Sequence, residues 1–419
     1  MLGCLLIVFG ILLAQWLSLF NTCRNYVYTL KKLKLAESNR KNMSYLPYVA
    51  LIVPCKGLDS DFTQNILSLY NLEYKNYELF FITENAEDPA YEKLQILKKD
   101  HKSTSLAHKV HILTAGQSTT SSQKIHNLLY GYSRIPDTVE VLAFADSDIC
   151  VRKNWLNQLV WPLRKERIGA TSGYRWFVPI DKRWASLALS SINAKVAQML
   201  GNTRFIQAWG GSMAIRRNVF EKIGLKQIWA KALSDDYTLT FMVKKNRYKL
   251  LFVPSCLVAS HLNTTWKEVF EFCKRQLIIT RISASGTWWF GFASVIMSVL
   301  GPWGSLSLAI VSFIKQSYFD QWGLTFPWWP VWTFFTLAFF TSQAAQAVVR
   351  QAMINKILPE ETDALRNARL ADILFFWIWS FILTSSMLAS AFGRTIRWRG
   401  IRYRLLGPTE VAILTERPK

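Results

Sequence analysis

The chain has few of the side chains that most often bind transition metals or form disulfides, with six Cys and five His among 419 residues. No Cys-x-x-Cys pair and no Cys/His spacing typical of a metal site occurs. The cysteines are scattered, and several lie in apolar segments, which indicates reduced thiols facing a cytosol rather than a disulfide framework. No Ser-His-Asp or Cys-His arrangement is evident either, so nucleophilic catalysis of that kind is not indicated.

Acidic residues are scarce as well, because 28 Asp and Glu stand against 50 Lys and Arg, for a net charge of +22. Such a charge suits either nucleic acid or an anionic membrane surface. No nucleic-acid-binding motif is present, and the basic residues lie beside apolar segments and at the chain end. Hydrophobic residues make up 51% of the chain and 18 residues are Trp, as expected of membrane segments with interfacial aromatics. We therefore expect a membrane and phosphate-bearing ligands as partners, and no nucleic acid.

Residues 1–22 are predicted to form a transmembrane anchor, because residues 1–20 are almost wholly apolar and long enough to span a bilayer. A cleaved signal peptide is the alternative, but a basic start and an Ala-x-Ala-like cleavage site are missing. Basic residues follow between Arg24 and Lys34, so the positive-inside rule places the N-terminus outside and the next segment in the cytoplasm. Residues 35–48 are polar and are expected to form a loop.

Residues 286–393 are predicted to return to the membrane. Their apolar blocks are 288–314, 325–349 and 372–392. An Arg-rich tail, residues 394–419, follows and belongs in the cytoplasm. One crossing before the globular part and three after it would leave this tail outside. We therefore favour a hairpin of two short spans at Gly301-Pro302, which returns the tail inside.

Residues 35–283 alternate between strand and helix patterns. The strands are expected at 49–53, 78–83, 110–113, 141–145, 168–172 and 213–215, and the helices at 62–72, 89–99, 123–132, 155–163, 183–200, 237–246 and 266–281. This alternation predicts an α/β fold with a parallel sheet. The helix 183–200 suits either a core position or the membrane interface, where a lipid could enter.

The fourth strand ends in the motif on which the functional interpretation depends. Five apolar residues, 141–145, run directly into Asp146-Ser147-Asp148. Ligands of open α/β sheets bind at the carboxyl ends of strands, and Mg²⁺ is often held there by carboxylates and substrate phosphates. We expect Asp146 and Asp148 to hold Mg²⁺ or Mn²⁺ against a diphosphate; a pair of surface turn residues is the alternative.

Other polar residues are expected at the same edge of the sheet. The segment from Pro54 to Gly57 follows the first strand, and Glu84 follows the second. A carboxylate at Glu84 can accept a hydrogen bond from a base or a ribose, and Lys56 or Lys124 can neutralise phosphate.

A further carboxylate, Asp236, stands at the start of the helix 237–246, where the helix dipole favours its ionised form. An ionised carboxylate beside an acceptor hydroxyl is a general base. The alternative is a plain N-cap, for which Ser234, Asp235 and Asp236 all qualify.

These motifs resemble those of the family 2 glycosyltransferases, and within them the ceramide glucosyltransferase-like branch. The similarity runs from about residue 50 to 404. It is carried by Lys56-Gly57-Leu58-Asp59 with Asn65, by Glu78 to Glu87-Asp88-Pro89-Ala90, by Gln123-Lys124-Ile125-His126-Asn127-Leu128, by Asp146-Ser147-Asp148, by Asp235-Asp236-Tyr237, and by Thr395-Ile396-Arg397-Trp398-Arg399 with Arg402-Tyr403-Arg404-Leu405. Matches in this order over most of the chain are far more specific than any one motif.

The resemblance implies an A-type glycosyltransferase domain, a Rossmann-like mixed sheet that binds a nucleotide sugar, with N-terminal and C-terminal transmembrane helices. It implies inverting, metal-dependent transfer of glucose or a related hexose from a UDP-sugar to a lipid hydroxyl at the cytoplasmic membrane face, giving a β-glycolipid. The acceptor could be ceramide, diacylglycerol or a hopanoid-type lipid.

The resemblance also implies roles for single residues. Asp236 would be the catalytic base, Asp148 and Asp146 would bind the metal, and Glu84 would contact the uracil. The nucleotide-sugar site would comprise Pro54, Lys56, Gly57, Glu84, Lys124, Asn127, Asp146 and Ser147. The acceptor and diphosphate side would comprise Gly211, Asp235, Arg275, Gln276, Arg281, Trp398, Arg399, Arg402 and Arg404.

Two positions depart from the family pattern. Glu84 stands where the family usually has Asp, which keeps the charge but lengthens the reach. The (Gln/Arg)-x-x-Arg-Trp motif is degraded, because its Arg-Trp falls near Gln276-Leu277, with Arg275 one place earlier and no Trp. Arg275 or Arg281 can supply the missing charge. These departures keep a non-catalytic nucleotide-sugar or lipid-binding membrane protein as an alternative. A processive polysaccharide synthase is less favoured, because the chain has few spans and lacks the intact motif. The sequence carries no signal of oligomeric state.

Overall fold

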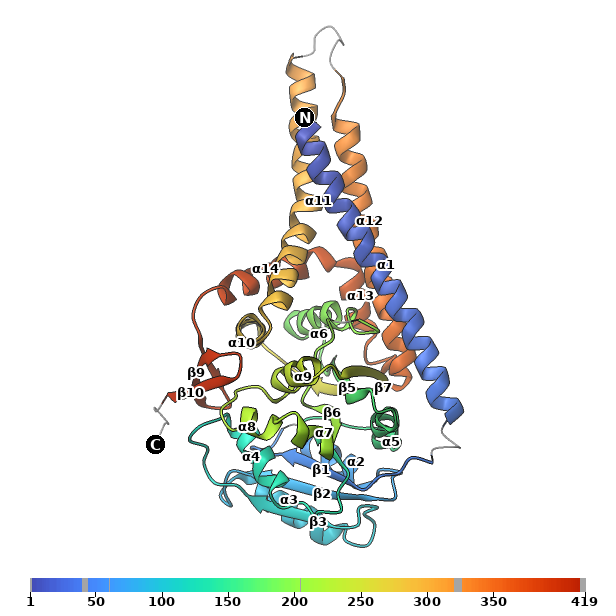
Figure 1. Ribbon diagram of the computed structural model, residues 1–419. Coiled ribbons are helices and arrows are strands. Elements are labelled where there is room, and N and C mark those ends of the chain that lie inside the picture. The colour runs from blue at the N-terminus through green and yellow to red at the C-terminus, as the bar shows by residue number, and fades with distance from the viewer. Residues whose placement is uncertain (1, 40–43, 60, 204, 320–325, 415–419) are drawn as a thin grey trace.

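The computed structural model describes residues 2–39, 44–59, 61–203, 205–319 and 326–414. It shows long helices that rise from one side of an α/β domain (Figure 1). Met1, Thr325 and residues 415–419, which the sequence assigned to the anchor, the second C-terminal block and the tail, lie outside the described residues.

The α/β domain is built on a seven-stranded sheet in the order β3-β2-β1-β4-β6-β5-β7. The strands are β1 (Val49–Pro54), β2 (Tyr77–Thr83), β3 (Val110–Thr114), β4 (Val141–Ala145), β5 (Ile168–Pro179), β6 (Ser212–Arg216) and β7 (Lys249–Leu262). In the described sheet β6 runs antiparallel to both of its neighbours, β4 and β5, while the other pairs are parallel. The sheet is therefore mixed, as the A-type fold requires.

The helices of this domain lie on both faces of the sheet. They are α2 (Phe62–Tyr70), α3 (Pro89–Asp100), α4 (Gln123–Tyr132), α5 (Trp155–Val160) with the 3-10 turn η1 (Trp161–Arg164), α6 (Trp184–Ala197), α7 (Arg217–Lys222), α8 (Leu225–Trp229), α9 (Asp235–Lys245) and α10 (Trp266–Ser283). Local chemistry fixes several starts: the Ser122 hydroxyl caps α4, and Thr265 and Glu268 form a capping box at α10.

The central strands are buried on both faces, which explains their continuous apolar runs. Along β1, Val49, Leu51 and Val53 belong to one hydrophobic cluster, and Ala50 and Ile52 belong to the other.

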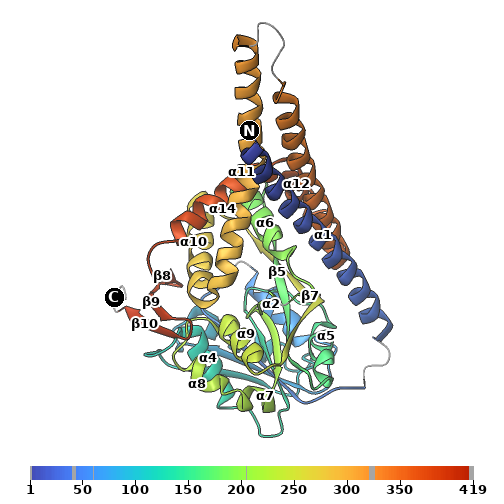
Figure 2. The same cartoon turned by 45° about the horizontal axis from the view of Figure 1, so that its top comes forward.

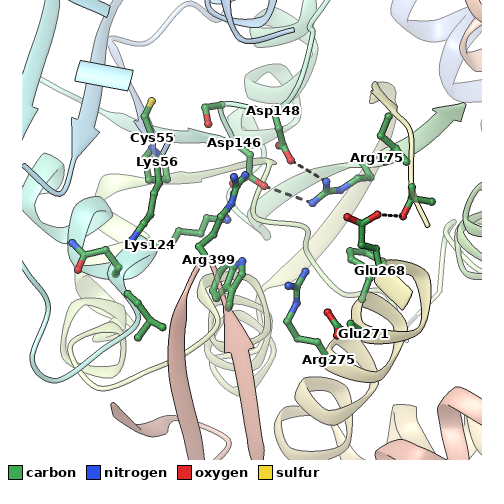
Figure 3. A pocket seen from close by; sticks show the side chains of 18 of the residues that line it. Cys55, Lys56, Lys124, Asp146, Asp148, Arg175, Glu268, Glu271, Arg275 and Arg399 are labelled. Atoms are coloured by element: carbon green, nitrogen blue, oxygen red, sulfur yellow. Dashed lines mark hydrogen bonds and ion pairs between the residues drawn. The ribbon is translucent and has the colours of Figure 1, made fainter. Parts of the chain in front are cut away.

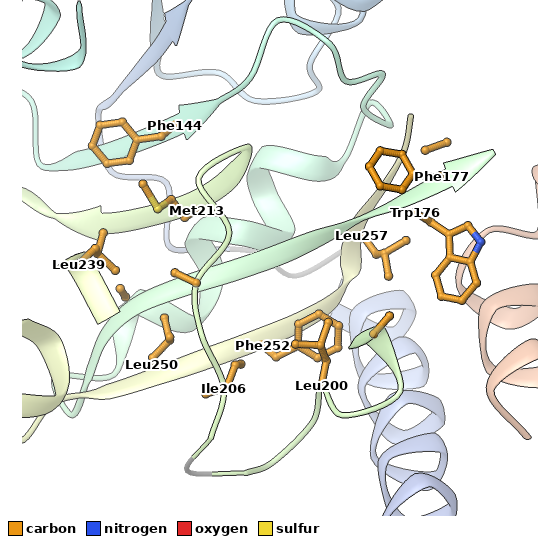
Figure 4. Packing of buried hydrophobic residues seen from close by; sticks show 14 of the residues in the cluster. Phe144, Trp176, Phe177, Leu200, Ile206, Met213, Leu239, Leu250, Phe252 and Leu257 are labelled. Atoms are coloured by element: carbon orange, nitrogen blue, oxygen red, sulfur yellow. The ribbon is translucent and has the colours of Figure 1, made fainter. Parts of the chain in front are cut away.

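Figure 4 shows part of the second cluster, where Phe144 of β4, Met213 of β6 and Phe252 of β7 pack between the sheet and the helices that cover it. This cluster continues into α6 and into the helices near the chain end, so the α/β domain and these helices share one core.

In the seven-stranded sheet, one strand was not predicted from the sequence, and another is longer than predicted. The run at 168–172 continues to Pro179 in β5, and β7 was not predicted. The two strands pair along most of their length with register shifts near Gly173. A Cβ atom at Gly173 would lie 2.0 Å from the Cys256 carbonyl oxygen, so only glycine permits this close approach.

Three long helices rise side by side from the domain in both views (Figures 1 and 2): α1 (Leu2–Asn39), α11 (Ser285–Phe319) and α12 (Trp329–Ile357). Among the described helices, residues 3–38 and 285–316 are long and apolar enough to cross a membrane. The helix α1 is longer than the predicted anchor, and residues 35–39, expected in a loop, are helical.

The C-terminal half of α1 contacts the α/β domain directly. The Asn25 amide donates to the Gln198 carbonyl oxygen at 3.0 Å, and the Tyr28 hydroxyl donates to the Phe252 carbonyl oxygen at 2.9 Å. Gly201 packs so closely here that a Cβ atom would lie 2.2 Å from the Asn25 side-chain oxygen. The anchor is therefore attached to the domain by specific contacts as well as by the chain.

The preferred hairpin at Gly301-Pro302 is wrong, because α11 continues through both residues. Proline removes one intrahelical hydrogen bond and frees the carbonyl four residues earlier, which is that of Ser298. The Gln343 amide of α12 donates to this carbonyl at 3.1 Å. Gly301 lies against the Phe339 ring, where a Cβ atom would come within 2.6 Å, so the glycine serves helix packing rather than a turn.

The last apolar block does not form one straight span. After the short turn η2 (Pro359–Glu361), α13 (Arg366–Leu374) and α14 (Phe376–Ser390) meet at an angle of 82°. Both views show α14 running across the long helices rather than along them (Figures 1 and 2).

A buried ion pair holds this turn in place. The Arg350 guanidinium of α12 bonds to the Asp372 carboxylate of α13, with 2.6 Å between Nε and Oδ2, and also reaches the Gln198 amide oxygen at 3.2 Å. Arg350 is 2% exposed and Asp372 is fully buried.

The Arg-rich segment was expected as a tail, and the structure corrects this. Residues 395–414 form a second sheet of β8 (Thr395–Trp398), β9 (Ile401–Gly407) and β10 (Glu410–Leu414). Alternate residues of β9 are buried, so the strand has the period of two that the arginine-rich composition concealed. Its buried face packs against α10 through Ile278 and Ile279.

We predict that Asp372→Ala lowers the stability of the protein by about 3–5 kcal/mol, because it leaves the buried Arg350 charge unpaired. Thermal unfolding in detergent micelles measures the change. The matched double variant, Arg350→Met with Asp372→Leu, should recover most of the loss. An unchanged melting temperature for Asp372→Ala would contradict the assignment.

Candidate active site

A cavity of about 460 Å³ opens at the carboxyl ends of β1 and β4, between the large sheet, α10 and the C-terminal sheet (Figure 3). Ten of the predicted site residues line it: Pro54, Lys56, Lys124, Asn127, Asp146, Ser147, Asp148, Arg275, Trp398 and Arg399. The structure thus gathers residues from the first 150 positions and from the chain end around one space.

The lysine of α4 joins two acidic residues at the cavity floor. The Lys124 ammonium lies 2.7 Å from Asp146 and 3.2 Å from Asp235. Burial opposes the charge of Lys124, but Asp146, Asp235 and Asp236 raise its pKa well above the ordinary value. Burial and the neighbouring carboxylates raise the pKa of Asp235 to about 6 against the opposing charge of Lys124. The lysine therefore makes this concentration of negative charge possible.

An arginine that the sequence reading missed balances the Asp-x-Asp motif from the other side. Arg175 of β5 lies 3.2 Å from Asp148 and 4.0 Å from Asp146. Burial acts to raise the pKa of Asp146, but Lys124 and Arg175 hold it below its ordinary value, so this carboxylate is ionised. Arg175 also stacks on Trp209, with 4.9 Å from the guanidinium carbon to the ring centre.

The two motif carboxylates fit the chemistry of a divalent cation. One oxygen of Asp148, Oδ1, is buried and has no hydrogen-bond partner among the described residues. No cluster of three or more His, Cys, Asp or Glu side chains suited to a metal occurs in the described part of the chain. Asp146 and Asp148 could therefore hold Mg²⁺ or Mn²⁺ in a site completed by substrate oxygens, the usual arrangement for Mg²⁺.

The end of β1 lines the part of the cavity expected to bind a base, whereas Gly57 and Glu84 lie beside it and are not among the lining residues. The Lys56 ammonium lies 3.1 Å from the Glu84 carboxylate. The Gly57 N–H donates to Asp88 at 2.8 Å, and Gly57 has a positive φ of 67°. The Asn127 amide donates to the Ile82 carbonyl oxygen, which fixes the start of α4 to the end of β2.

Two glycines bring the chain close to the acidic cluster. A Cβ atom at Gly210 would lie 2.2 Å from Asp235 and 2.7 Å from the Lys124 ammonium, and one at Gly211 would lie 2.8 Å from Asp146. Gly211, expected on the acceptor side, is thus placed here by its backbone and does not line the cavity.

The proposed base, Asp236, begins α9 beside this loop. Its carboxylate accepts hydrogen bonds from the Tyr237 N–H at 2.7 Å, from the Ser234 hydroxyl, and from the Gly210 N–H at 3.4 Å. Asp235 and Asp236 are not among the cavity-lining residues. The N-cap itself is Ser234.

The C-terminal sheet forms the opposite wall. Its β8–β9 turn has positive φ at Arg399 (47°) and Gly400 (84°), as in a tight hairpin. Arg399 bonds to Asp59 at 3.1 Å, and the Tyr403 hydroxyl accepts from the Gln123 N–H at 3.2 Å. The C-terminal segment is thereby connected to both the β1–α2 loop and α4.

The predicted basic residues of the acceptor side separate into two groups. Arg275 of α10 enters the cavity, where its guanidinium lies over the Phe272 ring. Burial, and then the charges of Arg175 and Arg399, lower its pKa to about 10. Arg281 instead donates to the backbone carbonyls of Ala391 and Gly393 and so connects α10 to the C-terminal segment.

Three further predicted residues stand away from the cavity lining. Arg402 and Arg404 lie on the exposed face of β9. Gln276 accepts a hydrogen bond from the Thr280 hydroxyl through its backbone carbonyl.

Comparison with known proteins shows the family of the chain. Residues 14–411 match the family described as glycosyl transferase family 21. The chain belongs to this family. Two Caenorhabditis elegans proteins are similar over shorter segments: ceramide glucosyltransferase 1 is 30% identical over 109 residues, and ceramide glucosyltransferase 3 is 27% identical over 114 residues. These segments cover 26% and 27% of the chain, but only 22% and 24% of the relatives' own lengths.

Solved glycosyltransferase structures are also similar. A mannosyltransferase from Pyrobaculum calidifontis, in complex with GDP-Man and Mn²⁺, is 15% identical with a TM-score of 0.46, covering 92% of this chain and 97% of its own. GalNAc-T7 with UDP, GalNAc and Mn²⁺ is 15% identical with a TM-score of 0.39, covering 56% of this chain and 51% of its own.

Several residues at this candidate site received no role from the sequence. Asp59, Gln123 and Tyr403 were named only as motif residues, and the others were not singled out: Arg175, Phe177, Leu189, Asn263, Glu268 and Glu271. For Arg175 the available signal was the apolar and aromatic run Tyr174 to Val178, interrupted only by this arginine, which continues the strand beyond Gly173. Glu268, Glu271 and Arg275 recur three to four positions apart on α10, a spacing that places them on one helix face.

We predict that Gly210→Ala weakens the binding of UDP with Mg²⁺ or Mn²⁺ about tenfold, because the new methyl group displaces Asp235 from Lys124. Isothermal titration in detergent measures the affinity. Gly304→Ala is the matched control, since a Cβ atom there meets nothing within 4 Å. Equal affinities for the two variants would show that the close approach at Gly210 does not contribute to binding.

Proposed function

We propose that the protein transfers glucose or a related hexose from a UDP-sugar to the hydroxyl of a membrane lipid, with inversion, giving a β-glycolipid. Ceramide, diacylglycerol and hopanoid-type lipids are the acceptor classes. The observation that carries the proposal is one cavity with a carboxylate pair and basic residues on the sheet side and with α10 on the other. Membership of family 21 and the similarity to ceramide glucosyltransferases support it.

On the donor side, Lys56 and Glu84 would bind the base, and Asp146 and Asp148 would hold Mg²⁺ or Mn²⁺ against the diphosphate. Such an ion would neutralise charge that develops on the leaving diphosphate. Lys124, Arg175 and Arg399 add positive charge around the same space, and preorganised charges of this kind stabilise a departing anion.

On the acceptor side, Asp236 would take the proton of the lipid hydroxyl. The hydroxyl oxygen forms a bond to the anomeric carbon while the bond from that carbon to the diphosphate oxygen breaks, and UDP leaves with the bonding electrons. A single displacement of this kind inverts the anomeric centre. The N–H groups of Gly210 and Tyr237 hold the Asp236 carboxylate in position through hydrogen bonds.

We propose that the α/β domain faces the cytoplasm. The N-terminus and the far ends of α11 and α12 lie at one end of the molecule, whereas the α/β domain and the C-terminal sheet lie at the other (Figure 1). The helices α1 and α11 are long and apolar enough to cross a membrane. If α12 crosses beside them and α14 lies along the surface, the three crossings bring the Arg-rich sheet to the same side as the basic residues between Arg24 and Lys34 of α1. This arrangement agrees with the positive-inside rule. It also places the C-terminal segment inside without the two short spans that were expected at Gly301-Pro302.

A transfer assay tests the function. Purified protein in nanodiscs is supplied with UDP-glucose or UDP-galactose, with Mg²⁺ or Mn²⁺, and with ceramide or diacylglycerol. We expect UDP release that depends on acceptor and metal, together with a β-glycolipid detected by mass spectrometry and NMR. UDP binding without turnover on any pair would favour a non-catalytic binding protein, and chain elongation would favour a polysaccharide synthase.

We predict that Asp236→Asn lowers kcat about 10²–10⁴-fold, the range for loss of a general base. The KM for the UDP-sugar should change little, because Asp236 does not line the donor cavity. Asp100→Asn, the same substitution at the exposed end of α3, is the control and should keep full activity. Full activity in Asp236→Asn would eliminate this residue as the base.

A further inference from the structure

The α10 side of the cavity carries polar groups that the proposed chemistry does not use. Glu268, Glu271, Phe272 and Arg275 share one face of α10, and Asn263 joins them from the segment between β7 and α10. Figure 3 shows Glu268, Glu271 and Arg275 on this helix, across the cavity from Asp146 and Asp148.

These groups differ in how their hydrogen bonds are satisfied. Glu268 belongs to the capping box: it accepts from the Thr265 N–H at 2.8 Å and from the Thr264 hydroxyl at 3.2 Å. Within the described part of the chain, the side chains of Glu271 and Asn263 make no hydrogen bond or ion pair. Arg275 has its ring contact with Phe272 but no carboxylate within ion-pair distance among the described residues. Glu271, Asn263 and Arg275 are therefore available to a ligand.

Their chemistry limits which ligand fits. A cationic head group would meet Arg175, Arg275 and Arg399, and an anionic one would meet Glu268 and Glu271. A neutral head with several hydroxyls can donate to the Glu271 carboxylate, accept from the Arg275 guanidinium, and do either with the Asn263 amide.

Apolar side chains adjoin these polar groups. Phe177, Leu189, Leu262 and Phe272 line the same cavity, and the Phe177 and Phe272 rings meet edge to face with 5.5 Å between their centres. They offer a surface for the aliphatic part of a lipid next to its polar head.

We propose that Glu271, Asn263 and Arg275 recognise a second hydroxyl of the acceptor, so that the preferred substrate is a lipid whose head carries at least two neighbouring hydroxyls. The inference rests on the proposed function and deepens it. A lipid with one hydroxyl, such as diacylglycerol, leaves Glu271 and Asn263 without a partner in the complex. Sites built to hydrogen-bond a hydroxyl discriminate strongly against analogues that lack it.

Two matched lipids test this. 1-O-Hexadecylglycerol has two adjacent hydroxyls, and its 2-O-methyl ether has one hydroxyl and the same chain. For the unaltered protein we expect kcat/KM to be about tenfold higher for the diol, equal to one 1.4 kcal/mol step. Glu271→Ala should reduce this preference to near unity while the KM for the UDP-sugar stays unchanged. Glu92→Ala, on the exposed face of α3, is the control and should keep the preference.

Equal use of the two lipids by the unaltered protein, or an unchanged preference in Glu271→Ala, would overturn the inference while leaving lipid glycosylation intact. Equilibrium binding of the two lipids, measured without the donor, tests the inference independently of transfer activity. Tighter binding of the diol that depends on Glu271 supports the inference even if no transfer is seen, an outcome that would instead contradict the proposed function.

Discussion

The ammonium of Lys124 is the interaction on which the site depends. It lies between Asp146 and Asp235, two carboxylates from different elements that burial would otherwise drive to protonation. Because α4 supplies this positive charge, the carboxyl end of β4 and the start of α9 can lie next to each other although both carry carboxylates. The Gly210-Gly211 backbone fits beside the same cluster only because it has no side chains. The position of Asp236 follows from that of its neighbour Asp235, so the proposed base is located by the same lysine.

Two further ion pairs, each formed by an arginine, border the site. Arg175 holds Asp148, and Arg399 holds Asp59. The C-terminal sheet therefore lines the same cavity as Asp146 and Asp148, which stand some 250 residues earlier in the chain. Its hydrogen bond from Gln123 to Tyr403 and its packing on Ile278 and Ile279 make this segment part of the domain.

The sequence was most informative where local signals agreed. The bounds of α4 and β4 were predicted to the residue, because a Ser cap and a short apolar run mark them. The Asp-x-Asp motif and Lys124 could be placed at one edge because parallel strands end together. Arg175 could not, since it lies beyond a glycine bulge that interrupts the strand pattern. The hairpin at Gly301-Pro302 failed because the partner that satisfies the freed carbonyl, Gln343, is distant in sequence. The C-terminal strands were concealed because the exposed positions of β9 are occupied by Arg402, Arg404 and Leu406.

The attachment of α1 to the domain has a consequence for how far the enzyme can reach. Asn25 and Tyr28 hold the end of α6 and the first part of β7 against α1, and a Cβ atom at Gly201 would collide with the Asn25 side chain. In the proposed membrane orientation, the helix would set a constant height between the bilayer and the cavity. A lipid would have to rise to that height, and the length of its head group, as well as its hydroxyls, would decide whether it arrives.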